Sequence, residues 1–253
     1  MKFLILVEKN LWRKLEMPNK PFFILSTRPL PQQLIQDATA KNIEVDCISF
    51  IETKPLHDDF IFIATEKYGK HSTVVFTSMN AVEALTNAVD TTGTRWRIAC
   101  MEGTTLNLVQ NKFPNSTIIA TASNAKQLAE KIIALNNDKY IAFFCGDKRR
   151  DELPALLKEN NIEVEEVVLY KTKFTPVIID KNYDAILFFS PSAVESFFSV
   201  NKINATTVLY AIGKTTVETI KQFSNNKIIE SASPSKEQLL KLAVEALNKI
   251  TNE

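Results

Sequence analysis

The sequence predicts an α/β protein with parallel β-sheets, divided into two domains. Short apolar runs alternate with helical patterns along the chain, which is typical of parallel strands joined by crossover helices. The two halves of the chain also repeat the same order of elements. The length of 253 residues exceeds one ordinary domain of roughly 100 to 150 residues and falls short of three.

Each half contains four apolar runs that we predict to be strands, and a helical pattern follows each of them. The first half has strands FFILS (22–26), TVVFTS (73–78), RIACM (97–101) and STIIA (116–120), with helices at 31–41, 80–89, 104–112 and 124–135. The second half has strands YIAFFC (140–145), AILFFS (185–190), TVLYAI (207–212) and KIIES (227–231), with helices at 151–160, 192–200, 215–223 and 235–249. The runs are apolar throughout, as expected for strands buried on both faces.

The repeat between the halves is weak in identity but consistent in order. Residues 22–54 align with 141–173 without a gap, and both segments contain the tetrapeptide NIEV. The junction VFTSMNAV, which begins at residue 75, has a counterpart in FFSPSAV, which begins at residue 188. These matches indicate a duplicated unit.

Two extended stretches interrupt the alternation of strands and helices, IEVDCISFIETKP (43–55) and IEVEEVVLYKTKFTP (162–176). We interpret them as paired linkers between two bodies, an arrangement that makes one domain discontinuous. The predicted domains are 17–43 with 175–253, and 54–163. The predicted linker strands are 44–53 and 164–174, and residues 1–16, which have no partner in the repeat, are interpreted as an N-terminal extension.

The composition excludes several classes of protein. The net charge of +1 leaves no electrostatic basis for binding nucleic acid. The three cysteines show no C-x-x-C spacing, so we expect neither a disulfide framework nor a zinc site. We expect a location in the reducing cytoplasm. The N-terminal FLILV run is too short for a signal peptide or a membrane span, so no membrane contact is expected. With only five glycines, the chain lacks both the P-loop and the dinucleotide fingerprint.

Hydroxyl and amide side chains follow most of the predicted strands. They include Ser26-Thr27, Thr77-Ser78-Asn80, Ser190-Ser192 and Thr215-Thr216. Each one alone suits the N-cap of the next helix and needs no ligand. Together they would gather at the carboxyl ends of parallel strands, where helix N-termini favour anions. Arg28, Arg150 and Lys214 would add positive charge at the same edges, or else are ordinary solvated cations.

Tyr170 breaks the symmetry of the repeat, because the aligned residue in the first half is Ile51. A phenol can donate a proton to a leaving oxygen, which makes Tyr170 a candidate catalytic residue. The alternative is an aromatic side chain that packs on one face of a two-stranded ribbon.

Several motifs together resemble the uroporphyrinogen-III synthase family over about residues 22–247. They are STRP (26–29), FTSMNAV (76–82), FFCGDKRRDELPALL (143–157), VVLYKT (167–172), FFSPSAVESF (188–197), AIGKTT (211–216) and SPSKEQLL (233–240). The resemblance implies two flavodoxin-like domains joined by a two-stranded β-ladder, with the active site in the cleft between them. It also implies a monomer that binds a linear tetrapyrrole with eight carboxylates and uses no cofactor.

The resemblance further implies a lyase of heme biosynthesis. Hydroxymethylbilane loses its terminal hydroxyl, the resulting azafulvene attacks the substituted carbon of ring D, and a spiro intermediate rearranges to the macrocycle with ring D inverted. Tyr170 falls on the tyrosine that is proposed to assist departure of the hydroxyl. Substrate-binding positions are implied at Thr27, Arg28, Thr77, Ser78, Asn80, Gly146, Arg150, Ser190, Pro191, Ser192, Gly213, Lys214, Thr215 and Thr216. The sequence departs from the family pattern at Glu102 and at Met79-Asn80, which weakens the expectation of contacts from residues 100–105.

Two other functions remain open at this point. Two α/β bodies joined by paired strands also describe an effector-binding module, which would bind its ligand unchanged. A signalling protein with tandem domains would need an acidic cluster around a phosphorylatable aspartate, and Asp147 and Asp184 form no such cluster in the sequence.

Overall fold

The computed structural model describes residues 21–69, 72–135, 138–233 and 235–251, so the predicted extension at 1–16 lies outside the described residues. The chain divides into two compact units. Unit 1 comprises the chain up to Ile51 and from Phe174 onward, and unit 2 is the continuous segment Glu52–Lys173. Both divisions fall inside the stretches that the sequence marked as linkers. Among the described residues, no helix is long and apolar enough to cross a membrane.

Unit 1 contains a five-stranded sheet in the order β11-β10-β9-β1-β2, and all its strand pairs are parallel. Its strands are β1 (Phe22–Ser26), β2 (Ile43–Cys47), β9 (Ala185–Phe188), β10 (Val208–Ala211) and β11 (Ile228–Glu230). Its helices are α2 (Gln32–Thr39), α8 (Pro191–Phe198), α9 (Lys214–Phe223) and α10 (Lys236–Thr251). Numbered along the chain, the spatial order is 2-1-3-4-5, the order of flavodoxin-like sheets.

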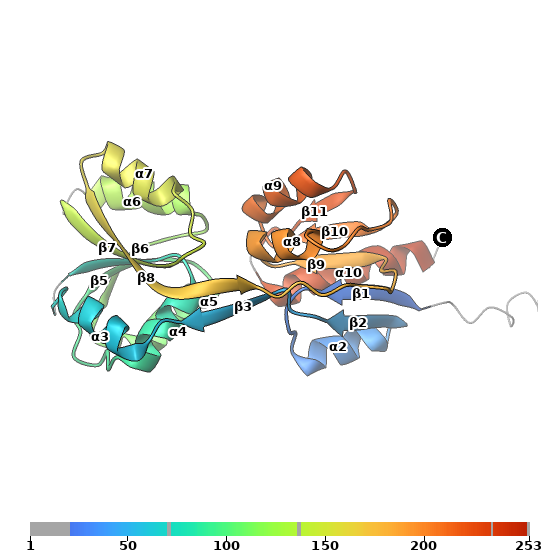
Figure 1. The fold of residues 1–253 in the computed structure, drawn as a ribbon, viewed down its shortest axis with the longest axis horizontal. Helices are drawn as coiled ribbons and strands as arrows, with labels where there is room; N and C mark the ends of the chain where they lie inside the picture. The colour runs from blue at the N-terminus through green and yellow to red at the C-terminus, as the bar shows by residue number, and fades with distance from the viewer. Residues whose placement is uncertain (1–20, 70–71, 136–137, 234, 252–253) are drawn as a thin grey trace, which may run out of the picture. The chain divides into compact units, whose positions relative to one another are not determined.

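Unit 2 contains a six-stranded sheet in the order β3-β8-β7-β4-β5-β6. Its strands are β3 (Ile51–Pro55), β4 (Thr73–Phe76), β5 (Arg97–Met101), β6 (Thr117–Ala122), β7 (Tyr140–Gly146) and β8 (Glu163–Phe174). Its helices are α3 (Asp58–Glu66), α4 (Met79–Ala88), α5 (Thr104–Lys112), α6 (Ala125–Leu135) and α7 (Glu152–Glu159). The segment β7-α7-β8 takes the place of β1-α2-β2, and β4, β5 and β6 take the places of β9, β10 and β11. Unit 2 is therefore a circularly permuted copy of unit 1 with β3 added at one edge (Figure 1).

The shared NIEV tetrapeptide has a backbone explanation. Asn42 and Asn161 have φ angles of 58° and 59°, and they are the two non-glycine residues with positive φ in the described part of the chain. Each one follows a helix and precedes a strand, and asparagine tolerates this left-handed conformation better than most residues. The repeat thus preserves the turn between α2 and β2 and between α7 and β8.

The interpretation of 44–53 as a single linker strand is corrected by the structure. Its first part belongs to β2, which pairs with β1 from Phe22↔Ile43 to Ser26↔Cys47. Its second part belongs to β3, which lies beside β8 and runs in the opposite direction (Figure 1). Apolar residues Ile43 and Val45 tie the first part to the core of unit 1. By contrast, 164–174 lies in one continuous strand, the 12-residue β8.

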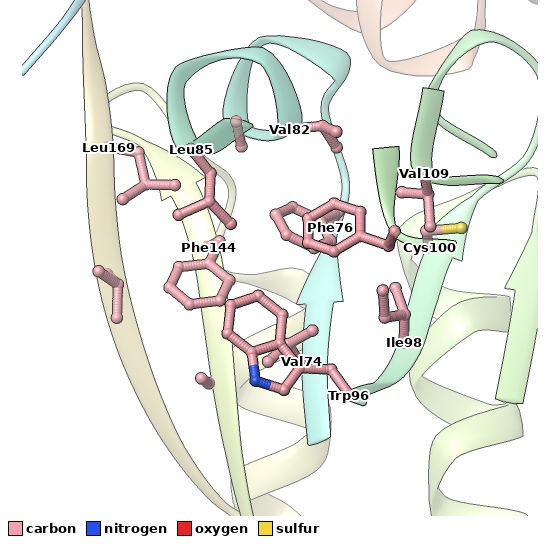
Figure 2. Close-up of a cluster of buried hydrophobic side chains, with 14 of the residues drawn as sticks. Val74, Phe76, Val82, Leu85, Trp96, Ile98, Cys100, Val109, Phe144 and Leu169 are labelled. Carbon is pink, nitrogen blue, oxygen red and sulfur yellow. The ribbon is translucent and has the colours of Figure 1, made fainter. Parts of the chain in front are cut away.

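Helices cover both faces of each sheet. In unit 2, one buried cluster gathers residues of the sheet with residues of α4 and α5 and with Ile61 of α3, and the second gathers residues of α6 and α7. Figure 2 shows the first cluster, in which the ring of Phe144 stacks with those of Phe76 and Trp96. With both faces covered, the carboxyl edges of the strands are the places where polar loops and helix N-termini meet.

Candidate functional site

The carboxyl edge of the unit 2 sheet brings together two of the predicted site segments. β4 and β7 are neighbours in the sheet, but the chain continues from β7 to β8 on one side and from β4 to β5 on the other. The carboxyl ends of β4 and β7 therefore form the switch point where ligands bind in open α/β sheets. Thr77 and Ser78 follow β4, and Gly146 ends β7. Ser78 caps α4, since its Oγ accepts a hydrogen bond from the backbone N–H of Asn80 at 3.2 Å.

Tyr170 of β8 reaches this switch point. Its hydroxyl donates to Ser78 Oγ at 3.1 Å. Its ring lies directly over Gly146, where a Cβ atom would approach ring carbon Cζ to 2.4 Å and the phenol oxygen to 2.8 Å. Glycine at position 146 therefore leaves the space that the phenol occupies.

The environment of Tyr170 raises the pKa of its phenol further above neutral pH. Burial raises the pKa of Tyr170 above its ordinary value of 10.0. Hydrogen bonds with Ser78 and Asn80 lower this pKa in part, and the charge of nearby Asp147 raises it further. At neutral pH the group is a proton donor, which is the form that general acid catalysis requires.

A small pocket of about 120 Å³ opens beside Tyr170. It is lined by Thr53, Pro55, Asn80, Glu83, Ala84, Asn87 and Tyr170. Pockets for whole drug-sized ligands are about 300 to 1,000 Å³, so this one suits a single substituent of a larger molecule. Among its lining residues, Tyr170 and Asn80 were predicted from the sequence as site residues, and Glu83, Ala84 and Asn87 were not.

The corresponding switch point of unit 1 lies between β1 and β9. Thr27 is 3% exposed, and both its N–H and its hydroxyl donate to the carbonyl of Leu187, at 3.0 and 2.8 Å. Because this hydroxyl donor is already used within the fold, we leave Thr27 out of the proposed binding set. Ser190 caps α8 through the N–H of Ala193 at 3.2 Å, and Pro191 occupies the first turn, where it needs no hydrogen bond.

The remaining predicted residues divide between the two edges. In unit 1, Gly213 is the N-cap of α9, which begins at Lys214; Lys214 is exposed, whereas Thr216 is 1% exposed. Arg28, Ser192 and Thr215 are partly buried near the ends of β1, β9 and β10. In unit 2, Thr77 is partly buried and Arg150 is exposed beyond β7. Sequence reasoning did not select Asp147, although it directly follows Gly146 at a strand end.

The cysteines contribute no nucleophile to the unit 2 edge. Burial raises the pKa of the Cys145 thiol to about 12 and that of Cys100 to about 11, so both are protonated at neutral pH. Cys47, at the end of β2, is exposed.

We predict that one of the three thiols reacts rapidly with a chromogenic aryl disulfide at pH 8 in the folded protein, and that all three react after unfolding. Cys47→Ser should abolish the rapid phase. Rapid reaction of a second thiol in the folded protein would contradict the burial of Cys100 and Cys145.

Comparisons with known proteins agree with this architecture. A family model described as uroporphyrinogen-III synthase HemD matches residues 32–241. The chain is similar to the uroporphyrinogen-III synthetase of Helicobacter pylori 26695, with 16% identity, coverage of 89% of this chain and 99% of that one, and a TM-score of 0.58. It is also similar to a mutant uroporphyrinogen III synthase from the extremely thermophilic bacterium Thermus thermophilus, with 12% identity, coverage of 92% and 100%, and a TM-score of 0.65.

At these identities the two solved structures show a shared fold. Among curated proteins, none matches the sequence. The family model, in contrast, spans most of the chain, from α2 into α10, and includes the switch point of unit 2 and Tyr170. The chain therefore belongs to the uroporphyrinogen-III synthase family.

Proposed function

We propose that this protein is a uroporphyrinogen-III synthase, a hydro-lyase that closes hydroxymethylbilane to uroporphyrinogen III with inversion of ring D. Family membership supports this reaction over ligand binding without turnover. The observation that carries the proposal within the molecule is the Tyr170 phenol, which stays protonated and hydrogen-bonded to Ser78 at a ligand-binding edge.

In the proposed first step, the Tyr170 hydroxyl donates its proton to the terminal hydroxyl of the substrate. The carbon–oxygen bond breaks, water leaves, and the pyrrole nitrogen supplies the electron pair that forms the azafulvene. Ring closure and rearrangement then proceed within the substrate, and the proton released when the last pyrrole regains aromaticity returns to the phenolate. The protein mainly holds the reacting ends in one geometry, which is itself a large contribution to rate.

Binding of the eight carboxylates is proposed at the strand-end residues of each unit. In unit 1 these are Arg28, Ser190, Pro191, Ser192, Gly213, Lys214, Thr215 and Thr216. In unit 2 they are Thr77, Ser78, Asn80, Gly146 and Arg150. Helix N-termini at α4, α8 and α9 offer backbone amides and a positive dipole end to anions, which supports this assignment. We further propose that the protein acts as a monomer in the cytoplasm.

The test supplies freshly prepared hydroxymethylbilane, oxidises the product and separates the type I and type III isomers. Closure without the enzyme retains the original orientation of ring D and gives type I. We expect predominantly type III, formed in proportion to protein concentration. Type I alone, at the rate without protein, would overturn the proposal and favour a binding module, which calorimetry with the same substrate would then detect.

A further inference from the structure

We propose that Gly146 and Asp147 together position the Tyr170 phenol at Ser78, so that both are positioning residues for the reaction. This inference rests on the proposed function. It assigns Gly146 and Asp147 a role in orienting the proton donor, in addition to any contact with the substrate. We call these two residues the clamp.

The first part of the clamp is a pair of hydrogen bonds from Asp147 to β8. The Asp147 backbone N–H donates to the carbonyl of Tyr170 at 3.1 Å. The Asp147 carboxylate oxygen Oδ1 accepts the backbone N–H of Thr172 at 2.8 Å. The two bonds bracket Lys171 and fix the β8 backbone immediately after Tyr170, which sets the direction in which the Tyr170 side chain leaves the strand.

The second part is a shift in the pairing of β7 with β8. Cys145 pairs with Val168, whereas the next residue, Gly146, pairs with Tyr170, so β8 contains one extra residue here. Successive residues of a regular strand point to opposite faces. Val167 and Leu169 pack in one core cluster and Val168 in the other, but Tyr170 packs with the same cluster as Leu169. The irregularity thus turns Tyr170 onto this face, which is a known use of β-bulges.

The third part is the missing side chain at Gly146. The space over its Cα is filled by the Tyr170 ring, and any Cβ would lie within 2.8 Å of Cζ, Cε2 and the hydroxyl. Alanine at this position would force the ring away from Ser78. In the aligned segment 22–54, Thr27 stands at the position of Gly146 and Ile51 at that of Tyr170. The copy of the repeat that has the tyrosine thus also has the glycine, and the other copy has neither.

The experiment compares Gly146→Ala and Asp147→Ala with matched controls. Gly93→Ala is the control for the glycine, because a Cβ there meets nothing within 4 Å. Asp90→Ala is the control for the aspartate, because Asp90 also accepts a backbone N–H, that of Thr92 at 2.9 Å, beyond the other end of α4. Asp147→Asn retains an oxygen acceptor for Thr172 and should restore function.

We expect kcat for type III formation to fall about 10-fold or more in both clamp variants, since a displacement of 1 Å can cost about 10²-fold. KM should change little in Asp147→Ala, because Asp147 is not among the proposed binding residues. The controls and Asp147→Asn should stay near wild type. In a Tyr170→Phe background, Asp147→Ala should cause no further loss. Wild-type kcat in both clamp variants, or an equal loss in the Tyr170→Phe background, would overturn the inference.

A second readout does not depend on activity. Alkaline absorbance titration, taken as the difference between proteins with Tyr170 and with Phe at that position, reports ionisation of this phenol. We expect the phenol to titrate above 10.0 in the wild type and closer to 10.0 in Gly146→Ala, because the displaced ring gains solvent. Loss of the Asp147 charge by itself lowers this pKa, so Asp147→Ala is compared with Asp147→Asn and should titrate below it. Unchanged titration in both variants would refute the clamp, whether or not the protein forms type III product. Failure of the wild type to form type III product would overturn the proposed function and would leave the titration as the test of the clamp.

Discussion

Replacement of Tyr170 by phenylalanine is expected to lower kcat for type III formation by about 10²-fold, at the lower end of the usual contribution of a general acid. The substitution removes the proton donor but keeps the ring over Gly146. Ser78 still accepts the Asn80 N–H and still caps α4, so the loss in stability should be about 1 kcal/mol. With slower catalysis, closure without the enzyme competes, and the fraction of type I product should rise.

Tyr140→Phe provides the matched control, because Tyr140 begins the strand that Gly146 ends and its phenol is bonded to Glu165, away from the switch point. Turnover should be measured for both variants, and circular dichroism should be recorded to verify that each one is folded. The raised pKa of Tyr170 also predicts that the donor form persists as pH rises through 10.0, the ordinary value for tyrosine. Wild-type turnover by Tyr170→Phe would remove the phenol from the mechanism and with it the purpose of the clamp.

Replacement of Phe144 by alanine is expected to lower the free energy of unfolding of unit 2 by about 3 to 5 kcal/mol. Phe144 is fully buried, and Figure 2 shows its ring beside those of Phe76 and Trp96. The centroid of its ring lies 5.4 Å from that of Phe76, 5.6 Å from that of Trp96 and 5.5 Å from that of Tyr68. Truncation would leave a cavity among three rings from different segments of the chain, which limits collapse of the site.

Denaturant unfolding followed by Trp96 fluorescence measures this loss, with Trp12 replaced by phenylalanine so that one tryptophan reports. Phe60→Ala on α3 is the control, since Phe60 is 52% exposed and its truncation should change stability by less than about 0.5 kcal/mol. A loss below about 1.5 kcal/mol for Phe144→Ala would show that the aromatic cluster rearranges to fill the space.

Most of the order of strands and helices was predictable because buried parallel strands are apolar throughout, and because Ser78, Asn124, Ser190 and Ser235 stand at helix N-termini, where each accepts a backbone N–H. The repeat also paired residues 22–54 with 141–173, which are the segments that contain β1-α2-β2 in unit 1 and β7-α7-β8 in unit 2. The helix α3 was missed, because its apolar run DDFIFIATE has no clear helical face, and Phe60, Phe62 and Ile63 remain exposed. The division of 43–55 into β2 and β3 was missed because it depends on which distant strand each part pairs with.

Parts of the site followed from the sequence, and others depend on contacts between distant segments. Tyr170 stood out because its aligned partner is Ile51, and Ser78 because of its cap position. The role of Asp147 required the register of β7 against β8, which no local pattern encodes. Thr27 was selected as a ligand-binding hydroxyl, but its bonds to Leu187 depend on a strand about 160 residues away in the chain.

The circular permutation of unit 2 affects the order in which the two sheets are completed during synthesis of the chain. Unit 2 is continuous, so all the strands of its sheet exist once the ribosome has synthesised Phe174. β1 and β2 are made first, yet β1 must wait for its neighbour β9, and β10 and β11 come later still. At about 5 to 20 residues per second this leaves the apolar strand FFILS without its second partner, β9, for roughly 10 to 30 seconds after its synthesis. Newly made chains thus pass through a state in which the second unit is folded and the first presents an open strand edge, the point at which chaperones or aggregation would act.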